Sequence, residues 1–105
     1  MTIARLSIFK ALPGKKEELE KLLDEFEEFV SKEKGYISGF RFEATENTNE
    51  VGRISLWENQ QQADHVATMD HVVVLRNRIH RLIMPGHTEK ILVVKGKPKN
   101  FPIKP

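Results

Sequence analysis

Cysteine is absent from this 105-residue chain. Its absence excludes a disulfide-stapled scaffold and any chemistry that needs a thiolate. The sequence also lacks an apolar run near the roughly 20 residues that a membrane-spanning helix needs. Its first residues form no signal-peptide pattern. We therefore expect a cytoplasmic protein with no membrane partner.

Glycine-rich phosphate loops and converging carboxylates are missing as well, and aromatic residues are few. The chain has six Phe, one Trp and one Tyr. Basic and aromatic residues are not interleaved as they are in proteins that bind single strands, so nucleic acid is not an expected partner. If the chain does chemistry, the best candidates are its single tryptophan, Trp57, and the two histidines that follow it, His65 and His71.

Charge is nearly balanced, with 17 Lys and Arg against 15 Asp and Glu. Four of the lysines lie near the C-terminus, together with three prolines, in residues 95–105. We interpret these residues as a basic tail that keeps the protein soluble or lies across a partner subunit, without a catalytic role. Residues 1–94 are then one folded domain.

Hydrophobic periodicity divides this domain into strands, with alternating apolar residues, and helices, with apolar residues three and four apart. The predicted order is strand 2–11, helix 15–34, strand 36–44, strand 51–58, helical region 59–83 and strand 88–94. Asp70 resembles an internal N-cap that divides the second helical region. The order β-α-β-β-α-β is typical of an α+β ferredoxin-like sandwich, with a four-stranded antiparallel sheet and the helices on one face.

Alternation along the strands separates two faces of this sheet. We assign the more uniformly apolar face to the helices: Leu6, Ile8, Phe40, Phe42, Ile54, Leu56, Ile91 and Val93. The face left open then carries Ile3, Arg5, Ser7, Phe9, Arg41, Arg53, Ser55, Trp57, Leu92 and Val94. Apolar patches of this size are rare on monomers, so we expect a homodimer in which two copies cover the open face sheet to sheet.

Five short motifs follow one another along the domain. They are Pro13-Gly14-Lys15, Gly35-Tyr36-Ile37-Ser38-Gly39-Phe40, Trp57-Glu58, Ala63-Asp64-His65 and Asp70-His71-Val72. In this order, over residues 2–94, they resemble the antibiotic-biosynthesis-monooxygenase-like family of dimeric α+β barrels. The resemblance implies a ferredoxin-like unit paired into a dimeric barrel. It implies less about function, because the family includes cofactor-free quinol and anthrone oxygenases, haem-degrading enzymes and members without known activity.

Two classes of function remain open. The resemblance favours a cofactor-free monooxygenase acting on a small quinol-like or polyphenolic substrate. Such a substrate, once deprotonated, passes an electron to O₂ without a metal, so the protein has to supply an apolar pocket, a general base and donors for the developing oxyanion. The alternative is a non-catalytic small-molecule-binding or stress-related module, favoured if side chains such as Phe9, Phe40 and Phe42 fill the cavity.

Haem degradation is a weaker third possibility. That branch of the family carries an Asn in the first strand, a second Trp in the following helix and an axial His further on. This sequence has Ser7, Val66 and Arg76 near those positions. His71 or His80 has the imidazole that ligates haem iron, but the register differs. We therefore expect no haem and no other cofactor.

The candidate site residues lie at the end of the third strand and in the helical region after it. His65 and His71 are candidate general bases because histidine titrates near neutral pH, and His65 is preferred because its neighbours are small. Trp57 offers an aromatic platform and an N–H donor. Arg76 and Arg53 are candidate binding residues for an anionic oxygen. Each also has a structural interpretation, as a packing, helix-start or ion-paired residue.

No metal site is predicted. His65 and His71 are six residues apart, whereas two imidazoles on one helix face need a spacing of four. His80 and His87 flank a turn and are interpreted as surface residues.

Overall fold

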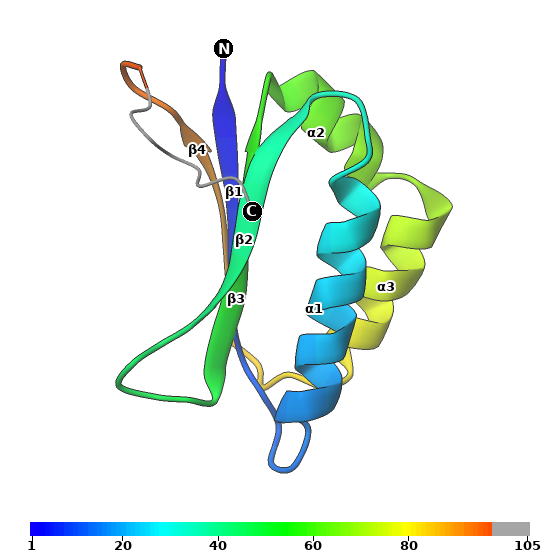
Figure 1. The fold of residues 1–105 in the computed structure, drawn as a ribbon. Helices are drawn as coiled ribbons and strands as arrows, with labels where there is room; N and C mark the ends of the chain where they lie inside the picture. The colour runs from blue at the N-terminus through cyan, green and yellow to red at the C-terminus, as the bar shows by residue number, and fades with distance from the viewer. Residues whose placement is uncertain (98–105) are drawn as a thin grey trace.

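The computed structural model describes residues 1–97 and forms a two-layer sandwich, with one sheet and three helices on the same side of it (Figure 1). The strands are β1 (Ile3–Lys10), β2 (Tyr36–Glu43), β3 (Glu50–Trp57) and β4 (Thr88–Val93). The helices are α1 (Lys16–Val30), α2 (Gln60–Ala67) and α3 (Asp70–His80). None of these helices combines the length and the apolar character that crossing a bilayer requires. Of the predicted tail, residues 98–105 lie outside the described residues.

The sheet has the strand order β2-β3-β1-β4, and each pair of neighbours is antiparallel. This confirms the predicted ferredoxin-like α+β fold. The central pair, β1 and β3, runs in register over eight residues and places Arg5 opposite Ser55 and Ser7 opposite Arg53. Directly opposed residues share a face of the sheet, so these four polar side chains form a compact group on one face.

Helix α1 ends at Val30, four residues before its predicted end. Its apolar stripe also ends there, because Val30 is its last buried residue. The chain then tightens, with the Lys32 amide donating to the Phe29 carbonyl. Gly35 has a φ of +95°, in the left-handed region that glycine adopts most readily. A Cβ atom at this position would also collide with the Gln62 side chain.

The second helical region is divided as predicted, although the caps differ from the prediction. Helix α2 has Asn59 as its N-cap, and the Asn59 side chain accepts a hydrogen bond from the Gln62 amide at 2.9 Å. Met69 precedes α3 without a side-chain cap, and Asp70 is the first helical residue rather than the N-cap. A carboxylate in the first turn still interacts favourably with the positive end of the helix dipole.

The assignment of the two sheet faces was wrong. The side that carries Ile3, Phe9 and Trp57 faces the helices, and these three side chains are buried. The prediction failed because Arg5, Ser7, Arg53 and Ser55 gave this side the polar alternation of a solvent face. In the structure these polar residues lie between two apolar clusters, of which one contains Phe9 and the other Ile3 and Trp57.

Strand β4 is the exception to this inversion, because Ile91 and Val93 point to the helix side and Leu92 to the open side as predicted, which is out of phase with the predicted alternation of the other three strands. The register pairs Ile3 with Val93 and Arg5 with Ile91, so Ile91 and Val93 point to the helix side of the sheet. Leu92 pairs with Ala4 and points to the other side. Ile91 and Val93 are each 46% exposed, because the helices do not extend over this edge strand, and Leu92 is 39% exposed on the open face.

The open face of the sheet is therefore the more apolar of the two. No helix of residues 1–97 covers it (Figure 1). The register places these apolar residues on it: Ala4, Leu6, Ile8, Phe40, Phe42, Ile54, Leu56 and Leu92. Inverting the faces thus strengthens the physical argument for a partner on the open face, because the apolar patch is larger and more uniform than expected.

Candidate functional site

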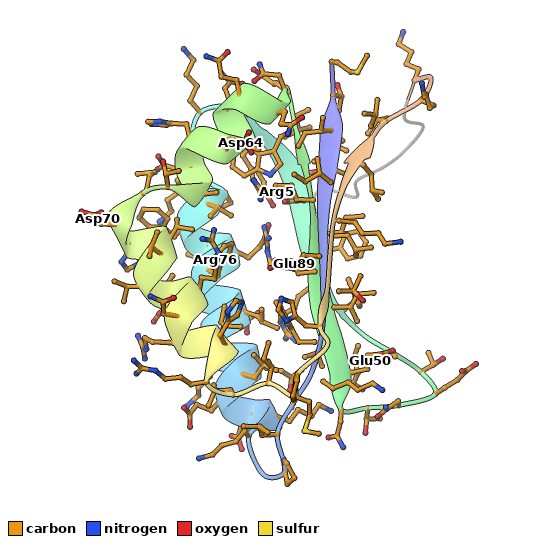
Figure 2. All side chains as sticks on the ribbon, turned by 180° about the vertical axis from the view of Figure 1, so that it is seen from behind. Arg5, Glu50, Asp64, Asp70, Arg76 and Glu89 are labelled. Atoms are coloured by element: carbon orange, nitrogen blue, oxygen red, sulfur yellow. The ribbon has the colours of Figure 1, made fainter. Side chains whose placement is uncertain are left out.

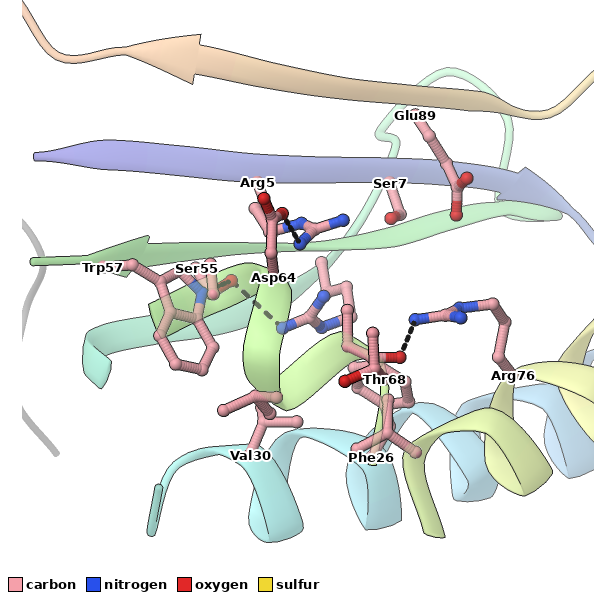
Figure 3. A pocket seen from close by; sticks show the side chains of 15 residues that line it. Arg5, Ser7, Phe26, Val30, Ser55, Trp57, Asp64, Thr68, Arg76 and Glu89 are labelled. Carbon is pink, nitrogen blue, oxygen red and sulfur yellow. Dashed lines mark hydrogen bonds and ion pairs between the residues drawn. The ribbon is translucent and has the colours of Figure 1, made fainter. Parts of the chain in front are cut away.

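A cavity of about 440 Å³ lies between the sheet and the helices, at the polar group of β1 and β3 (Figure 3). Strand residues form one wall, and α1, α2 and α3 form the other. Its lining residues are Arg5, Ser7, Phe26, Val30, Arg53, Ser55, Trp57, Ala63, Asp64, Val66, Ala67, Thr68, Val72, Arg76 and Glu89. A volume of this size is in the usual range for small-molecule sites.

A hydrogen-bonded chain of side chains underlies the deep wall of this cavity. The indole Nε1 of Trp57 donates to Ser55 Oγ at 2.9 Å, and Arg53 Nη2 donates to the same oxygen at 3.1 Å. Arg53 Nε donates to Glu27 Oε1 at 2.7 Å, and the Tyr36 hydroxyl donates to the other Glu27 oxygen. This hydrogen-bonded network therefore holds Ser55 and Trp57 in fixed orientations.

Burial and an aromatic contact secure the middle of this network. The side chains of Arg53 and Glu27 are only 8% and 16% exposed. The guanidinium carbon of Arg53 lies 4.6 Å from the ring centroid of Phe26 on α1. A guanidinium group that is removed from water is stabilised both by the carboxylate and by the face of the aromatic ring. The pair therefore ties α1 to β3 directly beneath the cavity.

The charged side chains of Arg5, Asp64, Arg76 and Glu89 line the cavity and lie between the sheet and the helices (Figure 2). Arg5 Nη1 lies 3.4 Å from Asp64 Oδ1, and Arg76 Nη2 donates to the Ala67 carbonyl at 3.2 Å. Burial lowers the pKa of Arg5; the Asp64 carboxylate opposes this shift, whereas Arg76 and Arg53 add to it by repulsion. Because Arg53 is paired with Glu27, the charges of Arg5 and Arg76 in the lining are balanced by those of Asp64 and Glu89.

Three of the five predicted site residues line the cavity: Trp57, Arg53 and Arg76. His65 and His71 do not line it, and both are exposed. The His71 ring instead lies against the Phe29 ring, with centroids 4.5 Å apart. The structure therefore does not support the prediction that a histidine overhangs Trp57 as general base.

Helix geometry explains why His65 lies outside the cavity. Ala63 and Val66 are three residues apart and are buried against the sheet side. Asp64 follows Ala63 at the edge of this face and points to Arg5 (Figure 3). Each residue turns the helix by about 100°, so His65 points away from the sheet. The motif Ala63-Asp64-His65 thus contributes its aspartate to the cavity.

Sequence reasoning missed Arg5, Ser55, Asp64 and Glu89 as site residues. One signal was present, because β1 and β3 both place an arginine and a serine two apart within otherwise apolar strands. Polar residues at alternate strand positions are usually on a solvent face. Two adjacent strands with matching polar positions are also consistent with a buried polar pocket.

The cavity is open rather than filled by phenylalanine side chains. Phe9 packs in an apolar cluster beside it, and Phe40 and Phe42 belong to the opposite face of the sheet. The arrangement expected of a filled cavity is therefore absent from the described residues.

Comparison with known proteins identifies the family and the fold. A family model described as antibiotic biosynthesis monooxygenase matches residues 3–78. The chain belongs to this family. No curated protein matches the sequence of this antibiotic biosynthesis monooxygenase family member at a significant level.

Solved structures of the same fold come from several organisms. Rv0793 from Mycobacterium tuberculosis superposes with a TM-score of 0.86 at 17% identity, covering 94% of this chain and 100% of that one. A conserved protein from Methanosarcina mazei superposes with a TM-score of 0.85 at 19% identity, covering 90% of this chain and 94% of that one. SnoaB, a cofactor-independent oxygenase from Streptomyces nogalater, superposes with a TM-score of 0.81 at 10% identity, covering 91% of this chain and 95% of that one. Similarity at such identities shows a shared fold.

The network makes a prediction for Tyr36, the only tyrosine of the chain. Burial and the hydrogen bond to the Glu27 carboxylate both raise the pKa of Tyr36 above its ordinary value of about 10. Because the folded-state pKa is raised, this stabilisation is fully present below about pH 10 and is lost as pH rises further. We expect tyrosinate absorbance at 295 nm to stay low at about pH 11 while the protein is folded.

The control for this titration is Tyr36→Phe, which should show no tyrosinate signal and no extra loss of stability above pH 10. Reversible ionisation near pH 10 with an unchanged circular dichroism spectrum would contradict the prediction.

Proposed function

We propose that this family member is a cofactor-independent monooxygenase whose substrate is a small quinol-like or polyphenolic molecule, bound as its anion. The observation that carries the proposal is the cavity itself. It combines an apolar wall, to which Trp57, Val66 and Val72 contribute, with the guanidinium groups of Arg5 and Arg76. An aromatic ring fits the first part, and a phenolate or enolate oxygen fits the second.

The hydroxyl of Ser55 is well placed to act on such an oxygen. A hydroxyl oxygen has two lone pairs and one proton. Trp57 and Arg53 already donate to this oxygen, so its acceptor capacity is filled. Ser55 is buried and lines the cavity, and its proton is then available for a bound oxygen atom. A donor fixed in this way stabilises developing negative charge without reorganisation.

Asp64 replaces His65 as the candidate proton acceptor. Its carboxylate lies at the mouth beside Arg5, within reach of a hydroxyl group on a ligand that enters between them. Arg5 and Arg76 favour the ionised form of the substrate and so reduce the basicity that Asp64 needs. This assignment uses an exposed carboxylate on a short helix rather than an imidazole.

The chemistry balances without an external reductant. The ionised substrate gives one electron to O₂, and the two radicals combine to form a C–O bond at a ring or benzylic carbon. Loss of water from the resulting hydroperoxide breaks its O–O bond and the remaining C–H bond at that carbon. For an activated methylene the overall reaction is R₂CH₂ + O₂ → R₂C=O + H₂O. The protein supplies the dry cavity, the donors and the proton acceptor.

An oxygen electrode tests the proposal with a panel of anthrones and hydroquinones and the chelator-treated protein. We expect oxygen uptake that is stoichiometric with product and that is abolished by heat denaturation. A panel member that binds without oxygen uptake would overturn the enzyme assignment in favour of a binding module. Absence of both binding and uptake across the panel would overturn the substrate class.

We further propose that the open face pairs two copies of the chain into a homodimer. Two of its apolar side chains, Phe40 and Leu92, are exposed in one chain and four more are partly exposed, and two-fold pairing buries the same patch on both. Light scattering should give about twice the chain mass of 12.1 kDa. Ile54 lies on β3 in the middle of this face, so Ile54→Lys should produce monomers.

A matched control for this test is Val74→Lys. Val74 is 53% exposed on α3, on the helix layer, and its replacement should leave the dimer intact. A wild-type protein that is monomeric at micromolar concentration, or an Ile54→Lys variant that remains dimeric, would contradict the proposed interface.

A further inference from the structure

Two histidines and a glutamate come together at the end of α3 and the start of β4, and of these three residues Glu89 also lines the cavity. His80 is the last residue of α3, His87 precedes β4, and Glu89 is the second residue of that strand. One ligand atom from each of them lies within 4.8 Å of the other two. Residues 81–87 form the loop that brings them together, and Gly86 has a φ of +88° in it.

From this cluster we propose a binding site for a divalent transition-metal ion of the Zn²⁺, Co²⁺ or Ni²⁺ type, held by His80, His87 and Glu89. Two imidazoles and one carboxylate are a ligand set that such ions favour. In a tetrahedral site with bonds of about 2.0–2.1 Å, neighbouring ligand atoms are roughly 3.3 Å apart. His87 Nε2 and Glu89 Oε2 already lie 3.6 Å apart.

The three ligand atoms have to move only a short distance to reach one ion, and most of this movement falls on exposed side chains. The His80 and His87 ring centroids are 5.0 Å apart. His80 and Glu89 are exposed, so their side chains can rotate toward a common ion without disturbing the core. His87 is partly buried and its ring lies against Phe9, with centroids 5.5 Å apart. One ligand is therefore positioned by the core, and two can close around the ion.

Two local features favour a cation at this position and oppose the positive charge of Arg5, with which Glu89 also interacts. His80 lies at the C-terminal end of α3, where the helix dipole and the last carbonyl groups present partial negative charge. Glu89 adds a full negative charge. Arg78, the nearby helix cation, is directed to Glu25 on α1 at 3.9 Å. Three protein ligands leave at least one coordination position for water or another molecule.

Sequence reasoning did not find this site because its spacing matches no metal motif. His80 and His87 are seven residues apart across a Pro85-Gly86 turn, and only the fold brings Glu89 beside them. The inference depends on the geometry of these three residues and does not rest on the proposed function.

Titration calorimetry with ZnCl₂, and Co²⁺ absorption spectra, test the site with untagged full-length protein. We expect one ion per chain and a tetrahedral or five-coordinate Co²⁺ spectrum. Removing a residue that only hydrogen-bonds to a metal ligand costs about 10–100-fold in metal affinity. His80→Ala and Glu89→Gln remove proposed ligands themselves, so each should weaken Zn²⁺ binding at least about tenfold.

The other two histidines of the chain provide the matched controls, because His65→Ala and His71→Ala remove exposed imidazoles from α2 and α3. Both variants should bind Zn²⁺ as the wild type does. His80→Ala changes only an exposed residue and should fold normally, as checked by circular dichroism. Unchanged Zn²⁺ affinity in folded His80→Ala, an equal loss in the two controls, or no binding by the wild type would overturn the proposal.

Discussion

Replacing Arg53 by methionine is expected to lower the free energy of unfolding by about 3–5 kcal/mol, the usual cost of removing one partner from a buried ion pair. Methionine keeps much of the side-chain volume but leaves the Glu27 carboxylate with the Tyr36 hydroxyl as its one remaining hydrogen-bond partner among residues 1–97. It also removes the contact of the guanidinium with Phe26. For a domain of this size the melting temperature should fall by roughly 15–30 °C.

Arg41→Met is the matched control. Arg41 lies directly opposite Arg53 on the neighbouring strand and pairs with two α1 carboxylates, Glu20 and Asp24. Its side chain is 31% exposed, against 8% for Arg53. Exposed pairs are usually worth about 0–1 kcal/mol, so we expect Arg41→Met to remain within about that range in urea unfolding. Equal losses in the two variants would show that burial does not distinguish the two pairs.

Replacing Ser55 by alanine is expected to lower kcat/KM by about 10²–10³-fold on any substrate that the oxygen electrode identifies, the usual effect of removing one oxyanion donor. The effect should fall mainly on kcat, because the proposed hydrogen bond strengthens as charge develops. The change also leaves Trp57 Nε1 and one Arg53 N–H without their acceptor, which costs roughly 1–3 kcal/mol of stability.

Ser38→Ala separates these two effects. Ser38 is also a buried β-strand serine, but it lies on the opposite side of the sheet, and its hydroxyl has no hydrogen-bond partner within residues 1–97. Its loss should leave turnover and melting temperature nearly unchanged. A Ser55→Ala variant that loses stability but retains kcat/KM would show that Ser55 only positions Trp57 and Arg53.

The order and type of the elements were predictable from the sequence because each element carries a clear local period. The stripe of α1 ends at Val30 and the stripe of α3 includes Val72, Leu75 and Ile79, all buried as expected. Turn residues such as Gly35 marked the ends of elements. These signals depend on neighbours within a few residues, so no long-range information was needed.

The faces of the sheet were not predictable in the same way. Period-two alternation separates two faces but does not say which one the helices cover. Here the covered face holds a polar cavity, so Arg53 and Ser55 gave it the appearance of a solvent face. The open face, with Ile54 and Leu56, looked like a core because it is the more apolar of the two.

The site residues could be found only in part for a related reason. Trp57 was identifiable as a rare residue at a strand end, and it does line the cavity. Asp64 and His65 are adjacent, and the rotation of a short helix decides which of them faces the sheet. Glu89 comes from a strand far along the chain, and only the β1–β4 pairing brings it opposite Ser7.

The positions of the only tryptophan and the only tyrosine give this protein a built-in optical probe. Trp57 lines the cavity, and the Tyr36 ring meets it edge-on with centroids 5.4 Å apart. Ultraviolet light absorbed by Tyr36 will therefore pass to Trp57 by energy transfer, and all tryptophan emission will come from one wall of the cavity. A ligand that enters should change the intensity or wavelength of this emission, so occupancy can be followed without a label.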